Sequence, residues 1–267
     1  MNSNQPFDAI ATEYDLQFSD TKVGKTQREL VWGFLRKIIN KSNTRTVLEL
    51  NCGTGIDARW LAENGLEVLA TDISSRMVEV AKNQSVGFND ISFLESDIQN
   101  IIETTNGRRF DLILSDFGGL NCISPQSFEL FLSQSLPKLL NPNGKVVLVI
   151  MPKFCLIESV YFLIKMQFSN VFRRNTNHAV SANLDSKTVI NIWYYSPAFI
   201  QKTLPKNLKI SHLQPIGFFI PPSYLNSLIE KRPQLLGFLK KLENWATKIP
   251  FLANFSDHFL IEISRES

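Results

Sequence analysis

The chain has 267 residues, 44% of them hydrophobic, so it can bury the core of a large domain and is not a disordered protein. Its formal net charge of +3 is too small to indicate a nucleic-acid partner by itself. The cysteines Cys52, Cys122 and Cys155 are widely spaced and form no C-x-x-C pair, which argues against a disulfide framework or a zinc site.

The chain begins with a polar, acidic segment, 1–15, that does not resemble a signal peptide. No apolar run approaches the ~18 uninterrupted residues that a membrane span needs. We therefore expect a cytoplasmic protein with no integral membrane span. An amphipathic helix is predicted at 26–39, where apolar residues recur at helical spacing.

Strand-like and helix-like segments then alternate up to residue 151. The strands are short and apolar, lie between turn residues, and are predicted at 46–50, 67–72, 91–95, 110–116 and 145–151. The helices between them are predicted at 55–64, 74–84 and 125–140, the last ending in the turn sequence NPNG. This alternation predicts an α/β fold with a doubly wound parallel sheet.

The pattern loosens after residue 151. We expect an apolar helix at 154–172, a polar loop at 178–187, a strand at 188–196, and a helix at 196–204 with Ser196 as its N-cap. The last two strands of the sheet are predicted at 208–216 and 257–264. A long aromatic insert with an amphipathic helix separates them.

We expect one domain built from a core and two lid insertions. The N-terminal helices and the cofactor-binding core occupy 1–151. The first lid insertion, 152–207, adds a strand and a helix, and the second occupies 218–255. The final strands lie within 208–217 and 256–267.

The segment VLELNCGTGIDA, residues 47–58, joins a buried strand to a helix through a glycine turn. Gly53, Gly55 and Ala58 match G-x-G-x-x-[GA], which by itself is weak evidence for a dinucleotide site. Glycines let the backbone approach a ligand, and the helix N-terminus offers unpaired N–H groups. The pyrophosphate of NAD or the carboxylate of S-adenosylmethionine could use them.

Acidic residues at the strand ends decide between these two cofactors. Glu49 would repel a pyrophosphate but favours the cationic end of S-adenosylmethionine. Asp72 can accept hydrogen bonds from ribose hydroxyls in either case, and Asp97 can accept one from an adenine amino group. An NAD(P)-dependent oxidoreductase is therefore the less favoured alternative.

Five segments resemble motifs of the class I S-adenosylmethionine-dependent methyltransferases: VLELNCGTG, VLATDIS, LESDI, FDLILSDFGGLNCI and LPKLLNPNGKVVLVI. The likeness is strongest to the branch with the ubiquinone and menaquinone C-methylases and many natural-product methyltransferases. It implies a Rossmann-like seven-stranded sheet, S-adenosylmethionine as cofactor and S-adenosylhomocysteine as product. FDAIATEYD resembles the leading segment of that branch, which implies that Tyr14 lies over the cofactor.

The sequence departs from the family at Asn51, where a glycine is usual. Asparagine tolerates a left-handed backbone, so the turn is expected to survive. Cys52 is expected to be a small residue of the turn and not a nucleophile, because its surroundings are acidic. The predicted cofactor-binding residues are Tyr14, Glu49, Asn51, Cys52, Gly53, Thr54, Gly55, Asp72, Ile73, Met77, Ser96, Asp97, Ile98, Ser115, Asp116 and Phe117. No metal site is predicted.

Methyl transfer needs alignment and exclusion of water, and it needs a base only if the acceptor has a high pKa. Asp116, in the turn after the fourth strand, could orient or deprotonate the acceptor, or it could merely cap the turn. His178, in the lid, is the other candidate base. Its replacement would lower turnover by roughly 10²–10⁴-fold if it has that role.

The two lid insertions are rich in aromatic residues, which favours a small lipophilic or aromatic acceptor and O- or C-methylation, as in secondary metabolism. SDFGG stands where base-methylating enzymes carry an NPPY-like segment, which argues against a nucleic-acid substrate. The alternative is a non-catalytic S-adenosylmethionine-binding or membrane-surface accessory protein, associated peripherally through the amphipathic segment 224–249. The acceptor and the oligomeric state remain open.

Overall fold

The computed structural model describes residues 5–185 and 188–266. A seven-stranded sheet has the order β3-β2-β1-β4-β5-β9-β8, in which the strands β1 to β5 pair in parallel and β9 is antiparallel to both of its neighbours, β5 and β8. In that order the strands are Ile91–Glu95, Glu67–Asp72, Thr46–Leu50, Phe110–Ser115, Leu140–Ile150, His258–Arg265 and Leu208–Ile216. The predicted doubly wound α/β fold is confirmed.

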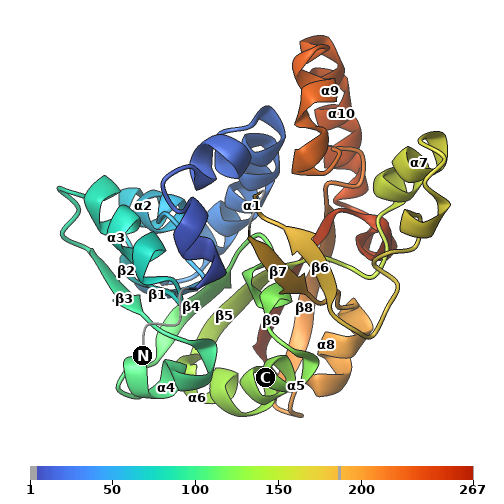
Figure 1. The fold of residues 1–267 in the computed structure, drawn as a ribbon. Helices are drawn as coiled ribbons and strands as arrows, with labels where there is room; N and C mark the ends of the chain where they lie inside the picture. Colours follow the sequence, from blue (N-terminus) through green and yellow to red (C-terminus); the bar gives the residue numbers. More distant parts are fainter. Residues whose placement is uncertain (1–4, 186–187, 267) are drawn as a thin grey trace.

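Helices cover both faces of the sheet (Figure 1). One face packs against the longer N-terminal helices α1 (Lys22–Lys41), α2 (Ile56–Glu63) and α3 (Ser75–Gln84). The other face packs against α4 (Ile101–Thr104), α5 (Pro125–Leu130), α6 (Leu136–Leu139) and α8 (Pro197–Thr203). Apolar side chains fill both layers, as the nearly continuous hydrophobic strands require.

Two short helical turns, η1 (Pro6–Ile10) and η2 (Asp15–Ser19), precede α1. The hydroxyl of Thr21 accepts the N–H of Gly24 and so caps the start of α1. The predicted helix 26–39 is therefore the middle of a longer one. The first of the two short turns, η1, contacts α3.

The predicted helix 125–140 is interrupted. A π-type turn, η5 (Phe131–Ser135), separates α5 from α6. The prediction of a turn at NPNG before the fifth strand is also wrong, because β5 already begins at Leu140, which pairs with Phe110. The register then shifts before Leu112 pairs with Lys145, so the NPNG residues form an irregular start of the strand.

The predicted helix 154–172 is too long. The observed helix, α7 (Leu156–Ile164), stops there because Met166 has a φ of 56° and no helix continues through a left-handed residue. A short turn, η6 (Phe168–Asn170), follows.

The predicted loop 178–187 contains a strand, β6 (Val180–Asn183), which pairs with β7 (Val189–Ile192) in a separate two-stranded hairpin. Residues 186–187 of that predicted loop lie outside the described residues. The predicted strand 188–196 ends early. Beyond β7 the backbone N–H of Trp193 donates to the carbonyl of Asn121, and that of Tyr195 to the carbonyl of Met151. This segment therefore runs past the carboxyl ends of β4 and β5.

The second insert contains η7 (Ser223–Leu225), α9 (Asn226–Glu230), α10 (Pro233–Ala246) and η8 (Pro250–Phe255). α9 and α10 project together from the body of the molecule (Figure 1). The buried carboxylate of Glu243 accepts four backbone N–H groups, from the residues 217–220, at 2.7–3.2 Å. It thereby fixes α10 to the chain leaving β8. No helix in the described part of the chain is long and apolar enough to cross a membrane.

Candidate cofactor and methyl-transfer site

The glycine turn after β1 has the conformation that its sequence predicts. Gly53 and Gly55 have φ values of 52° and 77°, and a Cβ on Gly55 would lie 2.9 Å from the ring of Phe93. Asn51 stands in the left-handed region at a φ of 57°, and its side chain donates to the hydroxyl of Ser115 at 3.0 Å. The expectation that asparagine can replace the usual glycine is confirmed.

Asp72 joins the end of β2 to this turn. One carboxylate oxygen accepts the N–H of Gly53 and the other the N–H of Ser74, both at 2.9 Å. Burial raises the pKa of Asp72, and these two backbone bonds oppose that change. Each oxygen keeps a further lone pair, so the carboxylate can still accept hydrogen bonds from a diol.

Two acidic side chains at the ends of β1 and β4 have buried oxygens without protein partners. Glu49 is 2% exposed and Asp116 8% exposed, and neither Oε2 of Glu49 nor Oδ2 of Asp116 has a hydrogen-bond partner among the described residues. Burial, and next the charge of Asp57, raise the pKa of both carboxyl groups well above their usual range. Buried polar atoms are almost always hydrogen-bonded, so this pair of acceptors points to a ligand with donors.

The sequence reasoning missed Arg28, which lies among these acids. Its guanidinium forms an ion pair with Asp57 of α2 and lies 5.0 Å from the centre of the Phe117 ring. Its positive charge lowers the pKa of Glu49 and Asp116 and so opposes the increase that burial causes. An arginine in a predicted amphipathic helix is expected to be exposed. The sequence therefore offered no signal that Arg28 would pair with Asp57 inside the site.

The N-terminal segment covers the turn. The ring of Tyr14 lies 4.0 Å from the position that a Cβ on Gly53 would occupy, and burial raises the pKa of Tyr14 to about 12. The hydroxyl of Thr54 donates to Asp15 at 2.7 Å. Tyr14 therefore lies beside the glycine turn, and its contact with the cofactor stays a prediction.

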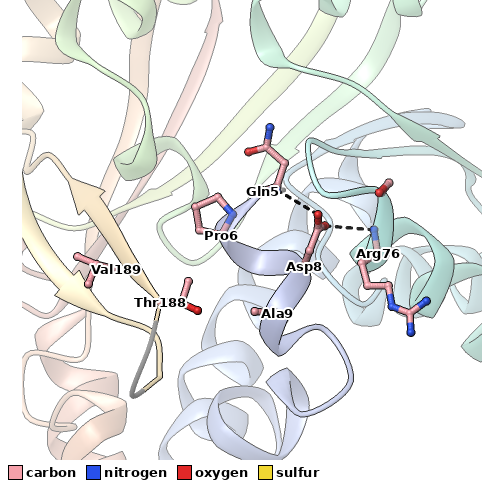
Figure 2. A pocket seen from close by; sticks show the side chains of 8 residues that line it. Gln5, Pro6, Asp8, Ala9, Arg76, Thr188 and Val189 are labelled. Carbon is pink, nitrogen blue, oxygen red and sulfur yellow. Dashed lines mark hydrogen bonds between the residues drawn. The ribbon is translucent and has the colours of Figure 1, made fainter. Parts of the chain in front are cut away.

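A pocket of about 640 Å³ lies beside this cover (Figure 2). Its walls come from η1, the start of α3 and the strand β7. The carboxylate of Asp8 accepts the hydroxyl of Ser74 at 2.5 Å and the N–H of Arg76 at 3.4 Å, so it stands at the N-terminus of α3. The lining residues, none of which was predicted, are Gln5, Pro6, Asp8, Ala9, Ser75, Arg76, Thr188 and Val189.

The remaining predicted residues have local partners. The hydroxyl of Ser96 contacts Thr104 at 2.7 Å, and Asp97 accepts the N–H of Gln99 and caps the following turn. Ile98 and Met77 are buried in the core and Ile73 is exposed. Burial, and next the charge of Glu49, raise the pKa of Cys52 well above its usual range, so this residue is a thiol, as expected from its acidic surroundings.

The two predicted catalytic residues are not brought together. Asp116 accepts the N–H of Phe117 at 2.8 Å, in the turn after β4. His178 is exposed on the loop before β6, where its backbone N–H donates to Thr176. No described contact joins the side chain of His178 to the turn after β4.

A different histidine contacts that turn. His258 begins β9, and its ring meets the edge of Phe117 at 5.6 Å between centroids. Its Nδ1 lies 3.2 Å from Oδ2 of Asp257, and its Nε2 lies 3.9 Å from the position that a Cβ on Gly118 would occupy. The sequence predicted the strand but not its antiparallel direction, which brings its first residue to this edge.

Comparisons with known proteins agree with this geometry. Residues 47–144 match the family described as a methyltransferase domain. The demethylmenaquinone methyltransferase of Clavibacter sepedonicus is 28% identical over 53% of this chain and 55% of its own length. The chain thus spans about half the length of the curated relatives that it matches.

Solved structures extend the likeness to the whole fold. The CcbJ methyltransferase from Streptomyces caelestis has a TM-score of 0.63 at 14% identity over all of both chains. The structure of the DhpI–SAH complex has a TM-score of 0.58 at 18% identity, covering 97% of this chain and 93% of that one. Residues 47–144 therefore resemble a methyltransferase domain, and the whole chain shares its fold with these two solved structures.

Proposed function

We propose that this protein transfers a methyl group from S-adenosylmethionine to a small lipophilic acceptor. The observation that carries the proposal is the pair of unpartnered buried oxygens, on Glu49 and Asp116, beside the glycine turn. They suit an ammonium donor, whose charge would favour the ionised form of both groups, whereas the pyrophosphate of a dinucleotide has no hydrogen to donate to them. The bound cofactor would supply an activated methyl group on a sulfonium.

The residues of this chain would bind and orient that cofactor. The N–H groups at the start of α2 suit a carboxylate, since they carry the positive end of the helix dipole. Asp72 would accept the ribose hydroxyls and Asp97 the adenine amino group, as predicted from their places at strand ends. Tyr14 would close the site from above and exclude water.

The preference for a lipophilic acceptor rests on the lid insertions. If the lid aromatics only packed on one another, they would be buried. Phe238 is 58% exposed and Trp245 56% exposed, and most of the large exposed apolar side chains of the described residues lie within 152–255. Exposed apolar surface of this extent marks a binding surface for a ligand or a membrane.

Calorimetric titration with S-adenosylhomocysteine, and separately with NAD, tests the cofactor. We expect binding of the first, lost in Asp72→Ala. The matched control is Asp90→Ala, an exposed aspartate that precedes β3 at the opposite edge of the sheet. Binding of NAD alone would contradict the proposal and favour the oxidoreductase.

A second candidate, a membrane-surface accessory protein, is favoured by the surface of α10. Leu235, Phe238 and Trp245 are exposed on one stripe of this helix with Lys241 between them. The insert 218–255 contains five Lys and Arg against two Glu. Such a surface suits anionic lipid. Sedimentation with phosphatidylglycerol vesicles, lost at high salt and in Phe238→Ser, would support peripheral association. The absence of salt-sensitive binding would leave only an acceptor lid.

A further inference from the structure

We propose that His258 is the general base of this site and that the acceptor carries a hydroxyl group whose proton it takes. This inference rests on the proposed methyltransferase function and names both a catalytic residue and the chemical class of the acceptor.

The direction of β9 brings His258 to the site. Parallel strands end at one edge of the sheet, and an antiparallel strand begins there. Ile150, the last residue of β5, pairs with Phe259, so His258 lies at the level where β5 has ended. The turn after β4 reaches the same level, because Asn121 accepts the N–H of Met151 at 2.9 Å.

Asp257 lies beside the ring of His258, whose buried Nδ1 makes no hydrogen bond of good geometry to any described residue. Its Oδ2 lies 3.2 Å from Nδ1 of the ring, and its two oxygens also accept from Arg174 at 2.9 Å and from Gln27 at 3.1 Å. Burial would raise the pKa of Asp257, but the charge of His258 when its ring is protonated, together with Arg174, holds that pKa well below its ordinary value. When the ring is neutral, an ionised carboxylate beside Nδ1 favours the proton on that nitrogen and leaves the lone pair on Nε2.

The other ring nitrogen, Nε2, lies beside Gly118. Nε2 makes no hydrogen bond to any described residue and, unlike Nδ1, is not fully buried. A Cβ on Gly118 would lie 3.9 Å from Nε2 and only 2.9 Å from Cε of Met151. Gly118 also has a φ of 80°, which excludes most other residues. An acceptor hydroxyl can therefore approach Nε2 beside the turn that carries Asp116.

The proton balance of the reaction gives His258 a role. Methylation of a neutral hydroxyl forms one C–O bond from an oxygen lone pair and breaks the S–C bond, whose electron pair stays on sulfur. One proton is released, while the electron pair of the O–H bond stays on oxygen. Nε2 of His258 takes this proton and later loses it to water. The other two candidates fit less well, since Asp116 is assigned to the cofactor ammonium and His178 has no described contact here.

The tautomer of His258 is the first test, and it does not depend on activity. Long-range ¹H–¹⁵N correlation spectra of ¹⁵N-histidine protein would be recorded at pH 8 with S-adenosylhomocysteine. The signals of His258 are those that vanish in His258→Gln. We expect a neutral ring protonated on Nδ1. A ring protonated on Nε2, or on both nitrogens, overturns the proposal.

The second test separates this proposal from the function on which it rests. Lipophilic alkylphenols serve as probe acceptors, and transfer of a labelled methyl group is measured. We expect His258→Gln to lower kcat by about 10²–10⁴-fold with KM and S-adenosylhomocysteine affinity within about twofold of the wild type. His212→Gln, a histidine of β8, is the control and keeps its rate. Added imidazole should partly restore His258→Ala.

The outcomes are distinct. Failure of the wild type to bind S-adenosylhomocysteine overturns the proposed function itself. Binding without methylation of any phenol, or an unchanged kcat in His258→Gln, overturns only the role of His258. A loss of cofactor binding in His258→Gln would show a structural role and also contradict the proposal.

Discussion

The backbone N–H of Gly53 donates to the carboxylate of Asp72 at 2.9 Å, across 19 residues of sequence. This bond makes the glycine turn and the end of β2 a single unit, since the same carboxylate also accepts the N–H of Ser74 at the start of α3. A residue that was predicted as a ribose ligand therefore also shapes the turn.

Asp72→Asn tests this double role. The amide can accept at one oxygen only, so one of the two backbone N–H groups loses its acceptor. We expect the free energy of unfolding to fall by about 1–3 kcal/mol and the affinity for S-adenosylhomocysteine to fall at least about tenfold. Urea unfolding and calorimetry measure the two effects, and unchanged values in both would contradict the structural account.

Asn51 offers a matched pair of variants. An ordinary residue in the left-handed region costs roughly 1–2 kcal/mol, which glycine avoids. Asn51→Ala should lower the free energy of unfolding by about 1–2 kcal/mol, because it also loses the bond to Ser115. Asn51→Gly should lie within about 1 kcal/mol of the wild type. Equal losses in the two variants would mean that backbone conformation does not matter at this position.

The two lid insertions are joined through Glu158 of α7. Its carboxylate accepts from Arg173, from Arg174 and from the hydroxyl of Tyr224, at 2.7–3.0 Å. Burial alone would raise the pKa of Glu158, but the two arginines lower it from its ordinary value of 4.5 to about 2.

This shift predicts a pH dependence. A carboxyl group with a depressed pKa in the folded protein stabilises it above its unfolded pKa, and the contribution is lost as the pH falls from about 4.5 towards 2. The contribution amounts to about 3 kcal/mol. We expect Glu158→Gln to be destabilised at pH 7 and the difference from the wild type to shrink at low pH. Urea unfolding at several pH values measures it, and a constant difference would refute the assignment.

Glu243 is predicted to hold the second insert in place. Its two oxygens each accept two backbone N–H groups, and Glu243→Gln leaves two of these without an acceptor. We expect faster hydrogen exchange in 217–246, with an opening free energy lower by about 1–3 kcal/mol. Glu230→Gln is the control and should exchange as the wild type does, since this glutamate of α9 accepts, among the described residues, a hydrogen bond from Asn226 alone.

Much of the fold follows from the sequence alone. The bounds of β1, β2 and β3 agree with the predicted ranges and those of β4 differ by one residue, since buried parallel strands are short apolar runs between turns. The glycine turn and Asp72 were found for the same reason. Their chemistry depends on neighbours within one strand–turn–helix unit.

Only the tertiary structure decided the rest of the site. β6 was missed because it has only four residues within a polar segment, and its strand conformation depends on pairing with β7. Arg28 and His258 were missed because their roles depend on partners such as Asp57 and Gly118, which come from other elements. The hydrophobic pattern within a segment indicates which of its side chains are buried. The meeting of distant segments depends on the direction of each strand and the path of each insertion, which leave no signal in the residues themselves.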